Sequence, residues 1–284
     1  FKLAGVNKDQ FPEIPQFKST PMKLPAAVFN YFIQNTAFAI TNEVSRFTLS
    51  GAKFIVGDGS AKMVTTDGHR LAYIEKALGS SDSTDAIDTL IPKKALLELA
   101  KVSRDTASDI SFGEDNNHLY FEMEGRLLIS RKLSGSFPNY EMVMPKDNDK
   151  EAIFDLDDMR NAVRRVSLMA DERNRSIRVT VRTDEIELTA QSSEEGEGRE
   201  AVQADYSGEE FQLGFNWQYL LEFLNNAGSL EGSASADGEQ ESDGDGTVRV
   251  KEGRSPVRIS FQFKDANAQT QMSIAGDSLY DYKY

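Results

Sequence analysis

The sequence contains no cysteine, and it has only two histidines and one tryptophan in 284 residues. Without cysteine the chain cannot form disulfide bonds, thiolate metal sites or a cysteine nucleophile. His69 and His118 leave few possible members for an imidazole metal site or a catalytic triad. No stretch approaches the roughly 18 consecutive apolar residues of a membrane span, and the N-terminus lacks the features of a signal peptide. We therefore expect a cytoplasmic chain with no metal, no cofactor and no membrane partner.

Basic residues are also scarce relative to acidic ones. The chain has 32 Lys and Arg against 46 Asp and Glu, a formal net charge of −14. Taken alone, this charge argues against an ordinary nucleic-acid binder, whose affinity comes from neutralising phosphates. Residues 228–246 carry acidic side chains but no basic one, and they predict an inserted loop. An EF-hand beginning at Asp243 would place Arg254 where a bidentate Glu is needed, so a calcium site does not fit.

Two sequence features recur at nearly the same interval. Phe11-Pro12 returns as Phe137-Pro138, and the run from Leu96 to Leu99 returns from Leu220 to Phe223. Two independent features with the same spacing indicate an internal repeat, and the length suggests about two domains. We predict one copy of the repeat over residues 18–145 and a second over residues 146–284, with residues 1–17 forming the end of an earlier copy.

Both copies show the same order of hydrophobic patterns. A helix is predicted over about 25–40 and again over about 156–170, because apolar residues recur there at helical spacing. A second helix is predicted at about 93–103 and 216–227. Strand-like alternation and turn signals fill the intervals, with hairpins over 119–129 and 257–274. This pattern predicts an α+β fold in which helices cover one face of antiparallel sheets.

Known catalytic motifs are missing. The chain has no G-x-S-x-G elbow, Walker A loop, H-E-x-x-H motif or dinucleotide fingerprint. Residues 63–72 predict a strand, a tight bend and a second strand, with His69 and Arg70 projecting from the bend. A hydrolase or transferase that uses Asp67, His69 and Arg70 is an alternative, but no partner base or nucleophile lies nearby in the sequence. We therefore expect a protein that is not an enzyme.

Four segments resemble, in order, the bacterial DNA sliding clamps, which are the beta subunits of DNA polymerase III. TTDGHRLA at 65–72 is similar to the TDGHRLA signature of that family, and KLSGSFPNYEMVMP at 132–145 is similar to a second family segment. VSRFTLSG at 44–51 and GFNWQYL at 214–220 are the other two. The resemblance implies the DNA-clamp fold, in which repeated domains each pack two helices on antiparallel sheets. The chain would then hold the end of a truncated first domain (1–17), the middle domain (18–145) and the C-terminal domain (146–284), and would lack most of the first domain and the extreme C-terminus.

The resemblance also implies a function. Family members are DNA polymerase processivity factors: non-catalytic, head-to-tail homodimeric rings that encircle double-stranded DNA. They tether the DNA polymerase III catalytic subunit and other clamp-binding-motif proteins through a peptide-docking groove, and a clamp loader places them on DNA. A ring needs only weak phosphate contacts, so a negative net charge is compatible with it. The alternative is a clamp-like interaction module that binds peptides without encircling DNA.

Three sets of site residues follow from the resemblance. The peptide groove would contain Leu49, Thr66, Gly68, His69, Arg70, Leu71, Pro138, Val143, Asn216 and Tyr219. The DNA-facing cations would be Arg46, Lys93, Lys94, Lys101, Arg160, Arg164 and Arg165. The dimer interface would use Phe1, Leu3, Leu168 and Met169. Met142 stands where the family often has a basic residue, so the peptide preference is expected to differ. The chain stops before the usual V-M-P-M-R-L ending, which forms one wall of the groove in the family, so the peptide affinity is expected to differ as well.

Overall fold

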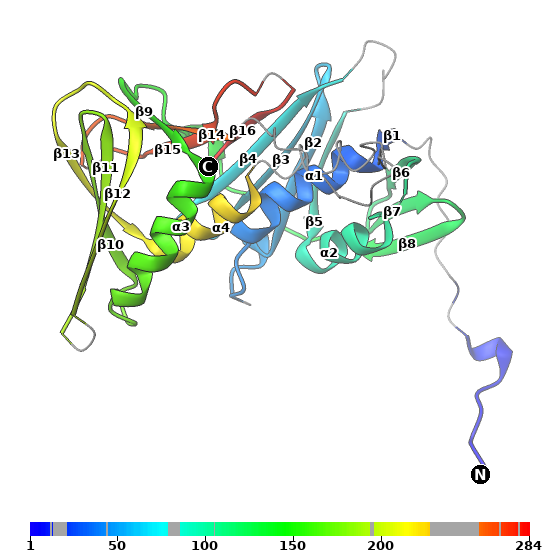
Figure 1. Ribbon diagram of the computed structural model, residues 1–284. Helices are drawn as coiled ribbons and strands as arrows, with labels where there is room; N and C mark the ends of the chain where they lie inside the picture. Colours follow the sequence, from blue (N-terminus) through cyan, green and yellow to red (C-terminus); the bar gives the residue numbers. More distant parts are fainter. Residues whose placement is uncertain are drawn as a thin grey trace, which may run out of the picture.

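A computed structural model describes residues 1–11, 13, 22–43, 45–78, 86–104, 106–193, 196–227, 256–266, 268–277 and 279–284. Within them, one order of elements occurs twice: strand, helix, four strands, helix, three strands (Figure 1). The first set is β1 (Met22–Pro25), α1 (Ala26–Thr36), β2 (Gly51–Gly57), β3 (Ser60–Thr66), β4 (Leu71–Ala77), β5 (Ile87–Pro92), α2 (Lys93–Val102), β6 (Asp109–Glu114), β7 (His118–Met123) and β8 (Arg126–Arg131). The second set is β9 (Lys150–Asp155), α3 (Leu156–Val166), β10 (Ser176–Arg182), β11 (Glu185–Ser192), β12 (Gly196–Asp205), β13 (Phe211–Asn216), α4 (Trp217–Asn226), β14 (Arg258–Phe263), β15 (Gln271–Ile274) and β16 (Asp281–Lys283). The predicted α+β class is confirmed, and the acidic segment 228–246 lies outside the described residues.

The recurring leucine run forms the buried stripe of α2 and α4. Leu96 and Leu99 are fully buried in α2, and Leu220 and Phe223 are buried at the equivalent positions of α4. Residues three apart on a helix share one face, so the repeated sequence places the same apolar stripe against the sheet in each copy. Helix α3 begins at Leu156 and is capped by Asp155, whose carboxylate accepts the backbone N–H groups of Asp157 and Asp158.

The hairpins follow from short turns with left-handed backbone. Asp58 and Gly59 join β2 to β3 with φ values of 50° and 74°, and Glu124 and Gly125 join β7 to β8 with φ values of 46° and 75°. Two consecutive residues with positive φ are typical of the two-residue turns whose twist suits antiparallel strands. The turn at Glu124 and Gly125 lies inside the hairpin that the sequence predicted over residues 119–129.

The strands form a four-stranded sheet (β1-β6-β7-β8), a five-stranded sheet (β16-β4-β3-β2-β5) and a seven-stranded sheet (β13-β10-β11-β12-β9-β14-β15). All recorded pairings are antiparallel. The last strand, β16, leaves its own copy and pairs with β4 of the first copy, placing Tyr282 opposite Ile74. Tyr284 then exchanges two backbone hydrogen bonds of 2.8 and 2.9 Å with Met272 of β15. The end of the second copy therefore connects its own sheet to the sheet of the first copy.

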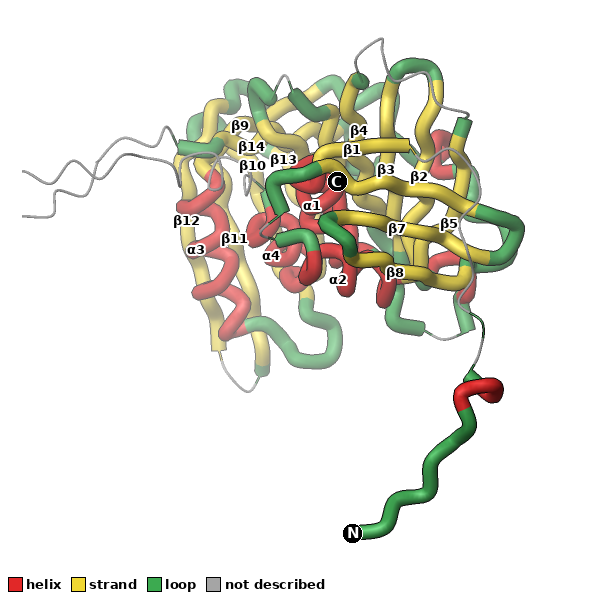
Figure 2. Tube along the Cα trace, turned by 90° about the vertical axis from the view of Figure 1, so that its right-hand side faces the viewer, coloured by secondary structure: helices red, strands yellow, loops and turns green. Residues whose placement is uncertain are grey.

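The helices form one continuous layer. Helix α1 packs against α2 and α4, and α4 packs against α3, which gives the spatial order α2-α1-α4-α3. Helix α1 lies on β3 and β4, and α3 lies on β11 and β12, so the layer covers the same side of both copies (Figures 1 and 2). No helix among the described residues is long and apolar enough to cross a membrane.

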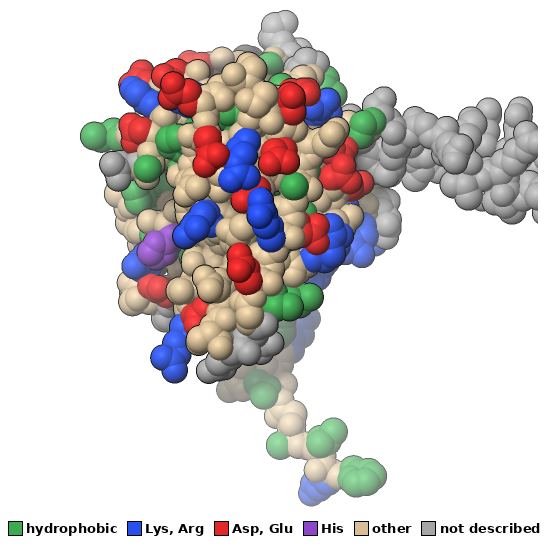
Figure 3. Space-filling model, turned by 60° about the vertical axis from the view of Figure 1, so that its left-hand side comes forward, with side chains coloured by type: hydrophobic (Ala, Val, Ile, Leu, Met, Phe, Trp, Pro, Cys, Tyr) green, Lys and Arg blue, Asp and Glu red, His purple; other side chains and the backbone are tan. Residues whose placement is uncertain are grey.

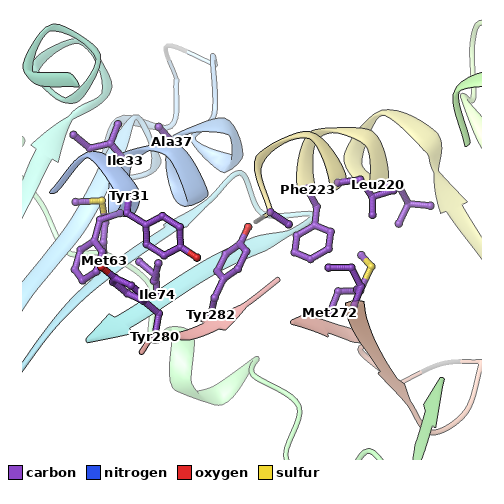
Figure 4. Packing of buried hydrophobic residues seen from close by; sticks show 14 of the residues in the cluster. Tyr31, Ile33, Ala37, Met63, Ile74, Leu220, Phe223, Met272, Tyr280 and Tyr282 are labelled. Carbon is purple, nitrogen blue, oxygen red and sulfur yellow. The ribbon is translucent and has the colours of Figure 1, made fainter. Parts of the chain in front are cut away.

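An aromatic core fills the junction of the two copies. Tyr31 of α1 lies with its ring centroid 4.3 Å from that of Tyr280, and Phe223 of α4 stacks on Tyr282 at 5.7 Å. Figure 4 shows Tyr282 of β16 between the α1 and α4 sides of this core. In contrast, residues 1–11 extend away from the body (Figures 1 and 2), and Phe1 is fully exposed.

Candidate functional site

The bend between β3 and β4 is held by its own side chains. The Asp67 carboxylate accepts the backbone N–H groups of His69 and Arg70 at 2.9 and 3.1 Å. The Thr66 hydroxyl donates to the Arg70 carbonyl at 2.6 Å and accepts the Gly68 N–H at 3.0 Å. Gly68 has a φ of +91°, which other residues rarely adopt. The bend is therefore a defined turn that leaves the His69 side chain exposed.

The side chain of Arg70 turns inward instead of projecting from the bend. Only 10% of it is exposed. Its Nε donates to Asp67 at 3.0 Å, and its Nη2 donates to the Phe38 carbonyl at 2.9 Å. The prediction that the Arg70 side chain projects from the bend is thus wrong. A guanidinium can satisfy five donor hydrogens in a planar fork, and the folded chain surrounds this one with acceptors.

Arg70 also joins the two copies of the repeat. It forms an ion pair with Glu222 of α4, and its Nη1 donates to the Tyr284 hydroxyl at 3.2 Å. Its guanidinium lies 4.3 Å from the centroid of the Tyr219 ring, a cation–π arrangement. Burial acts to lower the pKa of Arg70, but the Tyr284 hydroxyl and the Glu222 carboxylate outweigh it and raise the pKa. Arg70 is therefore charged at all accessible pH values and forms the polar centre of the junction.

A groove of about 340 Å³ lies beside this bend. It runs between the bend, the segment before β9 and the β15–β16 end of the second copy. Seven of the ten predicted groove residues line it: Thr66, Gly68, His69, Arg70, Leu71, Pro138 and Val143. Leucine, valine and proline side chains form an apolar surface, and polar groups stand at the edge, which is the usual composition of a ligand pocket.

Three predicted groove residues lie elsewhere. Leu49 is 8% exposed and packs in a small core with Phe137 and Tyr140. Asn216 caps α4, where its side chain accepts the backbone N–H of Gln218. Tyr219 contacts Arg70 and lines the hollow on the helix face instead of the groove. None of the three lines this groove: local packing, capping and the Arg70 contact engage their side chains, and their part in peptide binding stays a prediction.

The groove has further members that the prediction did not include. From the first copy these are Asn139, Tyr140, Met144 and Pro145; from the second they are Gln269, Thr270, Gln271, Lys283 and Tyr284. Those of the first copy stand inside the 132–145 segment that resembles the clamps, so the sequence held a signal for them. Those of the second copy become neighbours only because β16 pairs with β4, and no local pattern indicates that pairing.

A larger hollow of about 1170 Å³ lies on the helix layer, lined mainly by α1, α2 and α4. Lys93 stands on its wall and donates to the Ile40 carbonyl at 3.1 Å and to Asn42 at 2.9 Å. Burial lowers the pKa of Lys93. Lys94 and Lys101, also predicted to face DNA, are exposed on the same helix, α2. The face therefore presents lysines around a hollow that is lined by both polar and apolar side chains.

The predicted arginines are distributed over two sides of α3. Arg160 donates to the Leu224 carbonyl at 3.5 Å, and Arg164 donates to Asn225 at 2.8 Å, so both reach toward α4. Arg165 instead forms an ion pair with Glu200 of β12. These contacts do not place all three arginines on one face.

Arg46 and the charges of the seven-stranded sheet are likewise paired. Arg46 pairs with Glu43 at 3.0 Å and donates to the Asp67 carbonyl at 2.8 Å. On the side of the molecule next to the seven-stranded sheet, acidic and basic side chains alternate (Figure 3). Arg182, for example, contacts Glu210 at 2.8 Å. No unbroken positive surface forms on the side that Figure 3 displays.

The family follows from comparison with known proteins. The family model for the central domain of the DNA polymerase III beta subunit matches residues 23–139, and the model for its C-terminal domain matches residues 141–231. Together these ranges cover more than half of the chain in the order that the family has. The chain belongs to the DNA polymerase III beta subunit family. The resemblance predicted from four motifs is thus confirmed.

Curated relatives named beta sliding clamp support this assignment. The Haemophilus influenzae clamp is 29% identical over 228 residues, which are 79% of this chain and 61% of the relative. The Escherichia coli K12 clamp is 28% identical over 226 residues, again 79% and 61%. This beta-family chain therefore spans about three fifths of the length of the curated relatives that it matches.

Solved clamps share the fold. The Caulobacter crescentus beta sliding clamp superposes with a TM-score of 0.82 and 26% identity, covering 98% of this chain and 68% of that one. The Bartonella birtlesii clamp, determined with griselimycin bound, gives 0.81 and 26%, covering 100% and 70%. The predicted DNA-clamp fold is confirmed.

Tyr282, at the junction of the two copies, carries a hydroxyl that makes no hydrogen bond to any described residue, although the residue is only 2% exposed. An unpaired buried hydroxyl is costly, so Tyr282→Phe is expected to raise the free energy of unfolding by about 1 kcal/mol. The matched control is Tyr206→Phe, because the Tyr206 hydroxyl donates to the Glu209 carbonyl at 2.9 Å. Urea unfolding should show a gain for the first variant and a loss for the second.

The same residue predicts an alkaline effect. Burial raises the pKa of Tyr282 well above its usual value. In the unfolded chain a tyrosine ionises near pH 10. The contribution of this raised pKa to the free energy of unfolding is therefore complete below about pH 10 and is lost as the pH rises above it. Above about pH 10 the wild type should therefore lose about 1.4 kcal/mol per pH unit more than Tyr282→Phe does. Equal slopes in the two proteins would show that Tyr282 ionises freely in the fold.

Proposed function

We propose that this chain forms part of a processivity clamp, a non-catalytic ring around duplex DNA in the cytoplasm that tethers the replicative polymerase. The observation that supports it most is the continuous helix layer α2-α1-α4-α3, backed by sheets that β16 joins. Repeated around a closed ring, such a layer turns its helices to the hole and its sheets outward. In this proposal residues 18–145 are the middle domain, 146–284 the C-terminal domain and 1–17 the end of the first.

The cations proposed to face DNA suit a ring that slides. Arg160 is paired with Asp157, and Arg165 is paired with Glu200, which weakens their attraction for phosphates. Tight binding to DNA requires the neutralisation of several phosphates. A clamp held on DNA by its closed shape needs only weak contacts, and strong contacts would slow its movement. Lys94 remains exposed on α2 for such contacts, and Lys101, also exposed, forms an ion pair with Glu98 at 2.9 Å.

Ring closure is proposed to follow the same strand pairing seen inside the chain. Strand β16 is the last strand of the second copy, and it pairs with β4, which is the fourth strand of the first copy. The equivalent strand of the second copy is β12, which pairs with β9 only through Ala204 and Asp205. Its remaining backbone groups on that side are unpaired within the described residues and can accept another strand. We infer that the end of a partner's first copy, which carries Phe1 and Leu3, adds there.

Leu168 is the contact through which this closure can be tested. It is 71% exposed in a 3₁₀ turn (Ser167–Met169) that packs on β12. Leu168→Lys in the complete gene product should shift sedimentation from dimer toward monomer, because a lysine would be desolvated in the interface. Leu279→Lys is the control, since Leu279 is similarly exposed at 68%. If Leu168→Lys stays dimeric, Leu168 lies outside the interface.

The groove beside Arg70 is proposed to dock short apolar peptides. The DNA polymerase III catalytic subunit and other clamp-binding-motif proteins would supply these peptides, and a clamp loader would place the ring on DNA. Support comes from the apolar lining of Leu71, Pro138 and Val143 next to polar side chains. A few well-packed anchors provide most of the affinity in such complexes.

One experiment separates encirclement from ordinary DNA binding. The complete gene product is loaded onto nicked circular DNA with a clamp loader and ATP and is then separated by gel filtration. A clamp stays with the circle and leaves once a restriction enzyme linearises it. Retention on the linear DNA would contradict encirclement. Failure to load, together with normal peptide binding, would favour the alternative, a clamp-like module that docks peptides without a DNA role.

A further inference from the structure

Ser167 stands at the end of α3 in a run of five residues, Arg-Arg-Val-Ser-Leu. Arg164 and Arg165 lie three and two residues before the serine, and Leu168 follows it. Basophilic serine kinases select this arrangement, because their acidic groups pair with guanidinium groups before the hydroxyl and an apolar pocket takes the side chain after it. Two consecutive arginines occur nowhere else in the sequence.

We propose that Ser167 is a phosphorylation site and that its modification opposes closure of the ring. A basophilic serine kinase would transfer the γ-phosphoryl group of ATP to the Ser167 Oγ. A bond forms between Oγ and the γ-phosphorus, the bond from that phosphorus to the bridging oxygen breaks, the hydroxyl proton passes to the carboxylate base of the kinase, and ADP leaves. This inference rests on the ring closure proposed above and adds a means of regulating it.

Ser167 can be reached in the unassembled chain. It follows the last residue of α3 and begins the 3₁₀ turn Ser167–Met169, which contains no buried residue. Its hydroxyl donates to the Arg164 carbonyl at 2.9 Å, and the side chains of Arg164 and Arg165 are exposed. The end of a helix opens more readily than its centre, so a kinase can bind this segment after releasing the last turn of α3 and the 3₁₀ turn.

The 3₁₀ turn lies directly on β12, the strand at which the ring is proposed to close. A Cβ atom added at Gly198 of β12 would lie 3.0 Å from the Met169 side chain and 3.6 Å from the Val166 carbonyl oxygen. The turn therefore contacts the backbone of β12 with no side chain of Gly198 between them. Leu168, the proposed contact with the partner, is the residue after Ser167. A group attached to Ser167 would thus stand within the proposed interface.

The negative charge of a phosphate is unfavourable at this place. Arg165 forms an ion pair with Glu200 of β12 and is also attracted by Asp158 of α3. A phosphate carries about two negative charges at pH 7, so it would compete with Glu200 for Arg165 and leave the Glu200 carboxylate without its cation. It would also lie at the C-terminal end of α3, where the helix dipole disfavours an anion. Covering these charges with a partner strand would require their desolvation, which destabilises the closed ring.

Two other serines have an arginine three residues before them, and both fit a kinase less well. Ser134 is followed by a glycine instead of an apolar side chain, and Lys132 before it is held by Glu114 at 2.7 Å. Ser176 begins β10, and its backbone is held in the pairing with β13. Of the three, Ser167 alone combines the full sequence pattern with a position at the end of a helix.

The test of the site is phosphorylation of the complete gene product with ATP and the catalytic subunit of a cyclic-AMP-dependent protein kinase. Peptide mass spectrometry should locate the phosphate on Ser167, and Ser167→Ala should abolish it. Arg164→Gln should slow the labelling about tenfold, the effect of losing one charge-assisted contact with the kinase. Absence of phosphate from Ser167, or phosphate confined to Ser134 or Ser176, would overturn the inference.

Sedimentation tests the effect on the ring. The phosphorylated protein and Ser167→Glu should each raise the Kd of the dimer about tenfold or more, as expected for an unpaired charge placed in an interface. Ser45→Glu is the control, because it adds the same charge at an exposed serine of the first copy, and it should keep the Kd of the wild type. A phosphorylated protein with an unchanged Kd would overturn the regulatory role while leaving ring closure intact. An unmodified protein that is monomeric would contradict ring closure itself, and the regulatory role would fail with it.

Discussion

Phe223→Ala is expected to lower the free energy of unfolding by about 4 kcal/mol, the usual cost of truncating a buried phenylalanine. Phe223 is fully buried in α4. Its ring stacks on Tyr284 at 5.0 Å and on Tyr282 at 5.7 Å, so it packs α4 against the strand that joins the two copies. Figure 4 shows the Phe223 ring beside Tyr282, and the truncation would leave a cavity at this contact. The same change therefore weakens both the helix layer and the connection between the sheets.

Urea unfolding followed by tryptophan fluorescence measures this loss. Trp217 is the single tryptophan, and it stands at the start of α4, so its signal reports on the element that is changed. Phe47→Ala is the control because Phe47 is 65% exposed, and exposed substitutions usually change stability by less than about 0.5 kcal/mol. A loss below about 1 kcal/mol in Phe223→Ala would show that the site collapses around the smaller side chain.

The sequence was sufficient to predict the repeat and the class of fold, because both depend on local patterns. Helical spacing around Leu96 and Leu220 predicts α2 and α4, since the same spacing that marks an apolar stripe also buries it. Alternation on either side of Glu124-Gly125 predicts the β7–β8 hairpin for a similar reason. In each case the residues that determine the element are neighbours in the chain.

The site could be predicted only in part, because its second wall comes from far along the chain. The turn signal in residues 65–70 predicts the bend but not the direction of the Arg70 side chain. That direction depends on Tyr284, 214 residues away, and on Glu222. Lys283 and Gln271 reach the groove only through the β16–β4 pairing. A strand of three residues gives too weak a pattern for its partner to be identified from sequence.

Arg70→Met is expected to lower the free energy of unfolding by about 3 kcal/mol, because removing one member of a buried charged network leaves the others unpaired. Methionine fills much of the volume of the arginine side chain. It cannot donate the hydrogen bonds that Asp67 and the Phe38 carbonyl now accept, and it cannot pair with Glu222. Arg131→Met is a suitable control, since Arg131 is exposed on the edge strand β8. Denaturant unfolding of both variants gives the comparison.

A double variant shows whether unpaired charge causes the loss in Arg70→Met. Adding Glu222→Gln removes the carboxylate that Arg70→Met leaves without its cation, so part of the lost stability should return. The coupling between the two sites should be at least about 0.5 kcal/mol, as for residues in direct contact. Strict additivity would mean that Arg70 acts through packing on Tyr219 and Phe38. Positive coupling would instead identify the charged contact between Arg70 and α4 as the bond that holds the two copies at the edge of the groove.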